Sequence, residues 1–158
     1  AQQYSIALGL WRLLPNRRMM LAGFIEDSRS TRIHMTIGQR LPRLMGGVGR
    51  AIAAELRLDK EEMREEFDSL AWRVPPSFEE YERDVAQARE HGYARDSGNF
   101  APGVCTVATI IKDLDGQIRF GLSGIMFHGQ HAEDAIDRIG QGLVEMSKNA
   151  TLRLGGLT

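Results

Sequence analysis

Residues 104–125 read VCTVATIIKDLDGQIRFGLSGI and contain the pattern that decides the fold. Two runs rich in apolar residues, 104–112 and 117–125, flank the short segment Asp113-Leu114-Asp115-Gly116. An Asp-Gly pair between apolar runs is a strong local signal for a β-hairpin, because glycine adopts the backbone angles that a tight turn requires. The sequence therefore predicts two antiparallel strands joined directly to each other.

The first quarter of the chain carries a similar pattern. Residues 5–14 are mostly apolar and lead into Pro15-Asn16, a turn signal, after which residues 19–25 are apolar again. This arrangement predicts a second antiparallel hairpin. In residues 31–37, apolar and polar side chains alternate, and a period of two indicates a half-buried strand.

Residues 47–92 are predicted to be helical. The first helix follows a glycine-rich loop, and Asp59 can cap the second. Ser77 begins the third helix with Glu80 three residues later, which is the capping-box spacing, and Gly92 stands where a left-handed terminal residue is expected.

The remaining segments complete the predicted fold. Residues 95–102 are expected to form a loop, and residues 131–154 show helical spacing of apolar side chains over a long helix. Strands joined by hairpins favour an antiparallel sheet, which the helices must cover. The sequence therefore predicts the α+β class, with an antiparallel β-sheet flanked by α-helices.

Length and composition favour one domain over residues 1–158. The 20 Lys and Arg residues are scattered among 21 Asp and Glu, and the net charge is -1, so this chain lacks the basic patch expected of a nucleic-acid-binding domain. There is no apolar run of ~20 residues that predicts a membrane helix, and the start lacks a signal-peptide pattern. The single cysteine, Cys105, cannot form an intrachain disulfide, so we expect a cytoplasmic protein.

Two motifs resemble stretches of the IclR family of bacterial transcription regulators. Residues 38–51, GQRLPRLMGGVGRA, resemble the family's Gly-x-x-x-Pro turn followed by a small-residue loop that opens a helix. Residues 91–96, HGYARD, followed by GVCTVA at 103–108, resemble its Gly-Tyr-x-x-Asp stretch and the strand after it. The spacing to the Asp115-Gly116 turn and to Ser123 also matches, so the resemblance extends over roughly residues 5–155.

The resemblance implies a GAF-like effector-binding domain, the C-terminal half of such a regulator. It implies a small-molecule effector, an organic acid or an aromatic metabolite, and self-association as a dimer or tetramer. It implies no enzymatic activity and no cofactor. In this family a winged helix-turn-helix domain precedes the effector domain, and no part of this sequence resembles one, so DNA binding is expected only through a domain outside this chain.

The resemblance also implies a ligand pocket. The backbone N–H groups of Gly47 and Val48 would open a helix and could bind an anion, together with the hydroxyls of Thr106 and Ser123. The expected ligand-binding residues are Ser30, Ile33, Leu41, Gly47, Val48, Asp96, Val104, Thr106, Phe120, Ser123 and Ile125.

Some positions depart from the family pattern. Ile125 replaces a second serine, Phe120 stands where a small residue is common, and Arg50 stands where lysine is usual. These departures predict a more apolar and smaller pocket. Met35 is a further candidate for the pocket wall, although core packing is the simpler explanation.

Several structural explanations compete with these functional ones. The loop at residues 46–49 could be a tight turn that requires small residues, and Asp96 could brace its loop without touching a ligand. His128 and His131 do not form a compelling metal pattern, so no metal site is predicted. No base is evident that would activate Cys105 as a nucleophile.

Three other functions stay open from the sequence. The domain could be a GAF-type sensory module for another ligand, such as a cyclic nucleotide or a chromophore. It could be a dimerisation module without a ligand. A small enzyme is the least favoured, because the sequence contains no recognisable catalytic set.

Overall fold

The structure, a computed structural model, describes residues 6–26 and 35–156. Its centre is an antiparallel six-stranded sheet with the strand order β3-β2-β1-β6-β5-β4. The strands are β1 (Ala7–Leu14), β2 (Arg18–Ile25), β3 (Arg40–Pro42), β4 (Ala94–Ser97), β5 (Val104–Lys112) and β6 (Ile118–Phe127).

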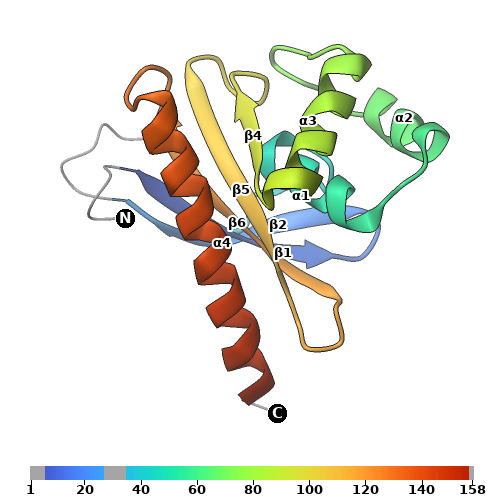
Figure 1. Ribbon diagram of the computed structural model, residues 1–158. Coiled ribbons are helices and arrows are strands. Elements are labelled where there is room, and N and C mark those ends of the chain that lie inside the picture. Colours follow the sequence, from blue (N-terminus) through green and yellow to red (C-terminus); the bar gives the residue numbers. More distant parts are fainter. Residues whose placement is uncertain (1–5, 27–34, 157–158) are drawn as a thin grey trace.

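Helices cover both faces of this sheet. The long helix α4 (Glu133–Gly156) crosses one face over β5 and β6 (Figure 1). On the other face, α1 (Gly46–Leu56) packs on β5, and α2 (Lys60–Asp68) and α3 (Phe78–His91) lie outside it. The predicted α+β, GAF-like class is confirmed.

Alternation along β5 divides the core between the two faces. Cys105 and Val107 belong to the apolar cluster under α4, whereas Ala108 belongs to the larger cluster under α1 and α3. Thr106 points to the same side as Ala108, because side chains two residues apart on a strand share a face. The hairpin predicted from residues 104–125 therefore supplies one wall to each of two cores.

The predicted helix caps are present. The Asp59 carboxylate accepts a hydrogen bond from the Glu62 N–H at 2.8 Å. The Ser77 hydroxyl accepts one from the Glu80 N–H at 3.1 Å. Gly92 ends α3 in the left-handed conformation with φ 85°. These local signals were sufficient to place the start of α2 and both ends of α3.

Two strands differ from the sequence prediction. Of the predicted third strand, residues 31–34 lie outside the described residues and residues 35–37 do not form a strand, so that part of the prediction is wrong. The chain turns at Gly38, whose φ of 92° suits glycine. It pairs with β2 through β3 and through two backbone hydrogen bonds that join Gly38 and Gln39 to Leu21. A loop was predicted where β4 lies. The prediction missed this strand because its four residues show no apolar alternation and include a charged side chain, Asp96, on the buried side.

The last helix is close to its prediction. α4 begins at Glu133, two residues after the predicted start, and continues to Gly156, two residues beyond the predicted end. None of the helices in the described ranges is both long and apolar enough to span a membrane.

Candidate functional site

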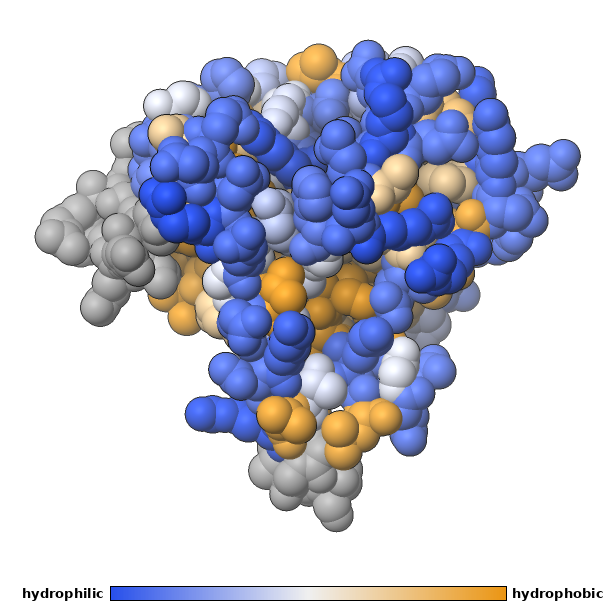
Figure 2. Space-filling model, in the orientation of Figure 1, coloured by the Kyte–Doolittle hydropathy of each residue, from blue (hydrophilic) through white to orange (hydrophobic). Residues whose placement is uncertain are grey.

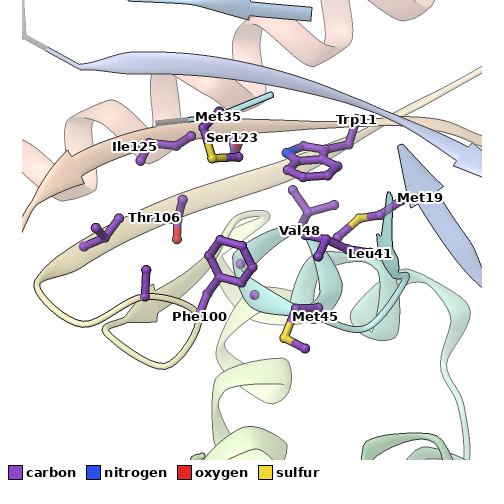
Figure 3. Close-up of a pocket in the computed structure, with 14 residues that line it drawn as sticks. Trp11, Met19, Met35, Leu41, Met45, Val48, Phe100, Thr106, Ser123 and Ile125 are labelled. Carbon is purple, nitrogen blue, oxygen red and sulfur yellow. The ribbon is translucent and has the colours of Figure 1, made fainter. Parts of the chain in front are cut away.

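A cavity of about 100 Å³ lies between the sheet and the start of α1 (Figure 3). It is on the face opposite α4, and strands β1, β2, β3, β5 and β6 all contribute to it. The lining residues are Trp11, Met19, Met35, Leu41, Met45, Gly46, Gly47, Val48, Phe100, Ala101, Val104, Thr106, Ser123 and Ile125.

The start of α1 forms one end of the cavity. Met45 precedes the helix, and no side chain caps its first turn. A β-carbon on Gly47 would lie 3.4 Å from the β-carbons of Thr106 and Ala108, so the helix begins directly against β5. The first N–H groups of a helix have no partner within the helix and carry its partial positive charge. This end of the cavity therefore suits an anionic group.

Close packing fixes that helix start in place. A β-carbon on Gly49 would lie 1.9 Å from the carbonyl carbon of Leu44, so only glycine fits there. The Tyr81 hydroxyl donates a 2.7 Å hydrogen bond to the Leu44 carbonyl. Burial raises the pKa of Tyr81 well above its ordinary value, so the hydroxyl stays protonated and remains a donor.

Two hydroxyl groups lie on the sheet wall, which also carries the indole N–H of Trp11. The Ser123 hydroxyl makes one long bond, 3.4 Å, to the Gly9 carbonyl. Within the described ranges, the Thr106 hydroxyl has no hydrogen-bond partner, although it borders the cavity. Both hydroxyls are available to a ligand that can donate or accept hydrogen bonds.

The other walls are apolar, and most of their residues were not predicted. Figure 3 shows the Trp11 ring and the Phe100 ring on different sides of the space, with sulfur atoms of Met19, Met35 and Met45 around it. Met35 is the one methionine for which a lining role was considered. Trp11 could have been found, because it lies two residues from Gly9 on the strand that pairs with β6. Phe100 comes from a loop, and no pattern in the sequence indicates its position.

The structure places seven of the predicted ligand-binding residues at the cavity and two away from it. Two others, Ser30 and Ile33, lie outside the described residues. The seven lining residues are Leu41, Gly47, Val48, Val104, Thr106, Ser123 and Ile125.

Phe120 is one of the two that lie elsewhere. It packs with Leu122 in the apolar cluster under α4. The spacing already implied this, since Phe120 and Ser123 are three residues apart on one strand and must face opposite sides. Phe120 therefore stabilises the α4 side of the sheet and does not narrow the cavity.

Asp96 is the second predicted ligand-binding residue that lies away from the cavity. Its side chain is buried and pairs with Arg50 at 2.8 Å. Its other oxygen accepts hydrogen bonds from the backbone N–H groups of Asn99 at 2.9 Å and Phe100 at 3.3 Å. Asp96 thus braces the loop that carries Phe100, as the structural alternative anticipated.

Among the residues that the structure describes, Arg50 is the largest of the fully buried side chains. From the sequence it was noted only as a departure from the family pattern. Besides Asp96, its guanidinium donates to Asp84 at 3.0 Å, to the Gly46 carbonyl at 3.1 Å and to Asn99 at 2.8 Å. Burial raises the pKa of Asp84, and the nearby Arg50 charge partly offsets that rise. One cation therefore connects α1, α3, β4 and the following loop.

The described residues offer no metal centre and no activated thiol. No group of three or more His, Cys, Asp or Glu among residues 6–26 and 35–156 could hold a metal ion. Cys105 faces α4 and is 1% exposed, and burial raises its pKa. A protonated, inaccessible thiol is a poor nucleophile.

The comparisons with known proteins show the family and the fold of the chain. The chain matches the family described as Bacterial transcriptional regulator IclR C-terminal over residues 10–151. It therefore belongs to the IclR C-terminal family, as the resemblance predicted. No curated protein matches the chain.

Solved structures of similar fold include three regulators. One is an IclR transcriptional regulator from Alicyclobacillus acidocaldarius, with 22% identity, a TM-score of 0.81 and coverage of 94% of this chain and 61% of that one. The Agobacterium tumefaciens repressor BlcR has 19% identity, a TM-score of 0.81 and coverage of 98% and 62%. IclR of Thermotoga maritima has 18% identity, a TM-score of 0.81 and coverage of 98% and 63%. This chain thus spans about three fifths of the length of each regulator, and at these identities the likeness shows the shared fold.

Proposed function

We propose that residues 1–158 are a single effector-sensing domain of an IclR-type transcription regulator that works in the cytoplasm. In the whole protein, a winged helix-turn-helix domain outside this chain would bind DNA. The effector is a small carboxylate, either an aliphatic organic acid or an aromatic acid. Catalysis is not part of the proposal.

The observation that carries this proposal is the composition of the cavity. Its walls are apolar, and its polar groups are the uncapped start of α1 and the hydroxyls of Thr106 and Ser123. A carboxylate at Gly47 and Val48 would accept hydrogen bonds from backbone N–H groups and from these hydroxyls. The apolar walls would exclude water and strengthen those bonds.

The volume supports a compact ligand. Pockets for drug-sized ligands have volumes of roughly 300–1,000 Å³, whereas a cavity of ~150 Å³ holds benzene. At about 100 Å³, this cavity is smaller than the one that holds benzene, so an acid of a few carbon atoms fits it better than an aromatic acid. The size argues against a cyclic nucleotide or a chromophore.

Signalling requires a second arrangement of the protein. We propose that the domain self-associates as a dimer or tetramer and that the effector binds one arrangement more tightly. Differential affinity is sufficient to shift the equilibrium between arrangements and so to move the attached DNA-binding domains.

A thermal-shift experiment tests effector binding. Butyrate and benzoate are the probes, and butyramide and benzamide are neutral controls of nearly the same shape. At ~100 times its dissociation constant, a ligand should stabilise the fold by ~2.7 kcal/mol. We expect stabilisation by at least one carboxylate but not by its amide, and a smaller shift in Thr106→Val and Ser123→Ala. Equal shifts with acid and amide would contradict the carboxylate assignment.

A second candidate function is assembly without a ligand. The small volume of the cavity and the apolar side chain of Ile125 at its wall favour this candidate. In that case no acid would shift the melting temperature. Thr106→Val, which replaces a hydroxyl without a partner by a methyl group of similar size, would then raise stability without changing self-association.

A further inference from the structure

We propose that the Arg50–Asp96 ion pair is a positioning device that holds two edges of the cavity, the start of α1 and the Phe100 loop, in the geometry that binds the effector. The inference rests on the proposed function in so far as it concerns a ligand. Neither charged side chain lines the cavity, so each acts through the backbone that it holds.

The first edge is held by Arg50. Its Nη1 donates both to Asp96 at 2.8 Å and to the Gly46 carbonyl at 3.1 Å. Gly46 is the first residue of α1 and borders the cavity. A displaced guanidinium would therefore release the turn whose N–H groups face the ligand.

The second edge is held by Asp96 and Asn99. One Asp96 oxygen accepts the N–H groups of Asn99 and Phe100, while the other pairs with Arg50. Asn99 also accepts a bond from Arg50 and exchanges two bonds with the backbone of Val74. These contacts fix the loop that carries the Phe100 ring into the cavity.

The two edges meet. A β-carbon on Gly46 would lie 3.9 Å from the β-carbon of Phe100, so the helix start and the loop are in contact distance at the cavity. Behind them, the rings of Trp72 and Tyr81 lie 5.3 Å and 5.1 Å from the Arg50 guanidinium carbon and confine it. One ion pair thus sets the relative position of both edges.

This role requires the guanidinium and not only its charge. Arginine presents five N–H donors in a fixed plane, and Arg50 uses three nitrogens on four partners. A lysine carries its donors on one nitrogen and cannot reach the same set. Arg50→Lys therefore keeps the charge and removes the positioning.

The test begins with amide hydrogen exchange, which is monitored by NMR on the chain without ligand. The reporters are the Gly49 N–H in α1, which donates to the carbonyl of Met45 just before the helix, and the Val74 N–H, which donates to the carbonyl of Asn99 in the loop. In Asp96→Asn and in Arg50→Lys, we expect exchange at both reporters to accelerate about tenfold more than exchange at the β1–β6 ladder, because opening at the two edges adds to any loss of global stability. Asp84→Asn is the matched control, because it changes an Arg50 partner that touches neither edge.

Binding of butyrate and benzoate is then measured in the same variants by calorimetry. We expect the dissociation constant to rise about tenfold in Asp96→Asn and in Arg50→Lys. The double variant should bind no more weakly than either single variant, because each substitution disrupts the same coupled unit. Asp84→Asn should stay within about twofold. If Asp96→Asn does not fold, Asn99→Ala loosens the same loop and should act in the same direction.

Each other outcome is decisive. Uniform acceleration of exchange across the whole chain would mean that the pair contributes only global stability, and it would overturn the proposal. A loss of affinity in Asp96→Asn but not in Arg50→Lys would make Asp96 a direct ligand contact, which also overturns it. If the wild type binds neither acid, the proposed function fails, while the exchange data still accept or reject the positioning role.

Discussion

A β-carbon placed on Gly121 would lie 2.3 Å from Cγ1 of Val48. The start of α1 thus packs into the space left by a missing side chain on β6, and this close approach brings the helix to the edge of the cavity. Val48 is β-branched and has little freedom to rotate away.

Gly121→Ala should therefore push α1 off the sheet. Overpacking of this kind costs about 1–3 kcal/mol, and urea unfolding followed by circular dichroism would measure it. Gly23→Ala is the control on β2, because its nearest neighbour would be an ordinary 3.7 Å away. Equal stability of the two variants would contradict the close packing of Val48 on β6.

Two glycines in α4 should respond in opposite directions to the same substitution. A β-carbon on Gly140 would lie 2.5 Å from the Tyr93 ring, whereas one on Gly142 would meet no atom within 4 Å. Gly142→Ala should stabilise the helix by about 0.5–1 kcal/mol, because alanine loses less backbone entropy. Gly140→Ala should destabilise the protein despite the same gain in propensity. Thermal unfolding of the two variants side by side tests both signs.

Local patterns made much of the sheet predictable. The β5–β6 hairpin follows from apolar runs on either side of an Asp-Gly turn, and α3 follows from its caps, because both signals lie within a few residues of what they specify. The edge strands β3 and β4 are three and four residues long. At that length no period can be recognised, and pairing with a neighbouring strand decides the structure.

Some residues of the cavity could be predicted from the sequence, and others could not. Thr106 and Ser123 were predicted from the family resemblance, and alternation along their strands agrees with their place on the cavity side. Trp11 was missed although its strand position places it on the cavity side, whereas Phe100 reaches the cavity through a loop whose path the sequence pattern does not contain. Arg50 is a charge at a buried position, and only its partners 34–49 residues away explain how it is accommodated.

The placement of Phe120 away from the cavity leads to a third prediction. Phe120→Ala should weaken packing under α4 and cost about 1–2 kcal/mol, because the side chain is half buried. It should leave unchanged the thermal shift that the bound carboxylate, butyrate or benzoate, produces. Ile125→Ala, on the same strand but facing the cavity, should change that shift. A reversed pattern would show that the two faces of β6 are assigned wrongly.

Removal of Asp96 should be far more costly than removal of an exposed acid. Asp96→Ala leaves the Arg50 charge buried without its closest partner, and loss of one member of a buried pair costs about 3–5 kcal/mol. Asp68→Ala breaks an exposed pair with Arg64 and should change stability by no more than about 0.5 kcal/mol. Denaturant unfolding of both variants measures the difference. A cost for Asp96→Ala as small as that for Asp68→Ala would mean that water reaches Arg50 in the native protein.

Cys105 should report unfolding of the α4 side of the protein. Its side chain is 1% exposed, and burial raises its pKa, so the native thiol is both covered and protonated near neutral pH. Ellman's reagent at pH 8 should therefore modify the native chain slowly and the urea-unfolded chain at once, with one equivalent released per chain. Gln141→Cys adds an exposed thiol on α4 and should raise the rapid reaction of the native protein to one equivalent. Rapid labelling of the unmodified native chain would show that α4 opens from the sheet on the timescale of the assay, and that the apolar cluster beneath it is only loosely closed.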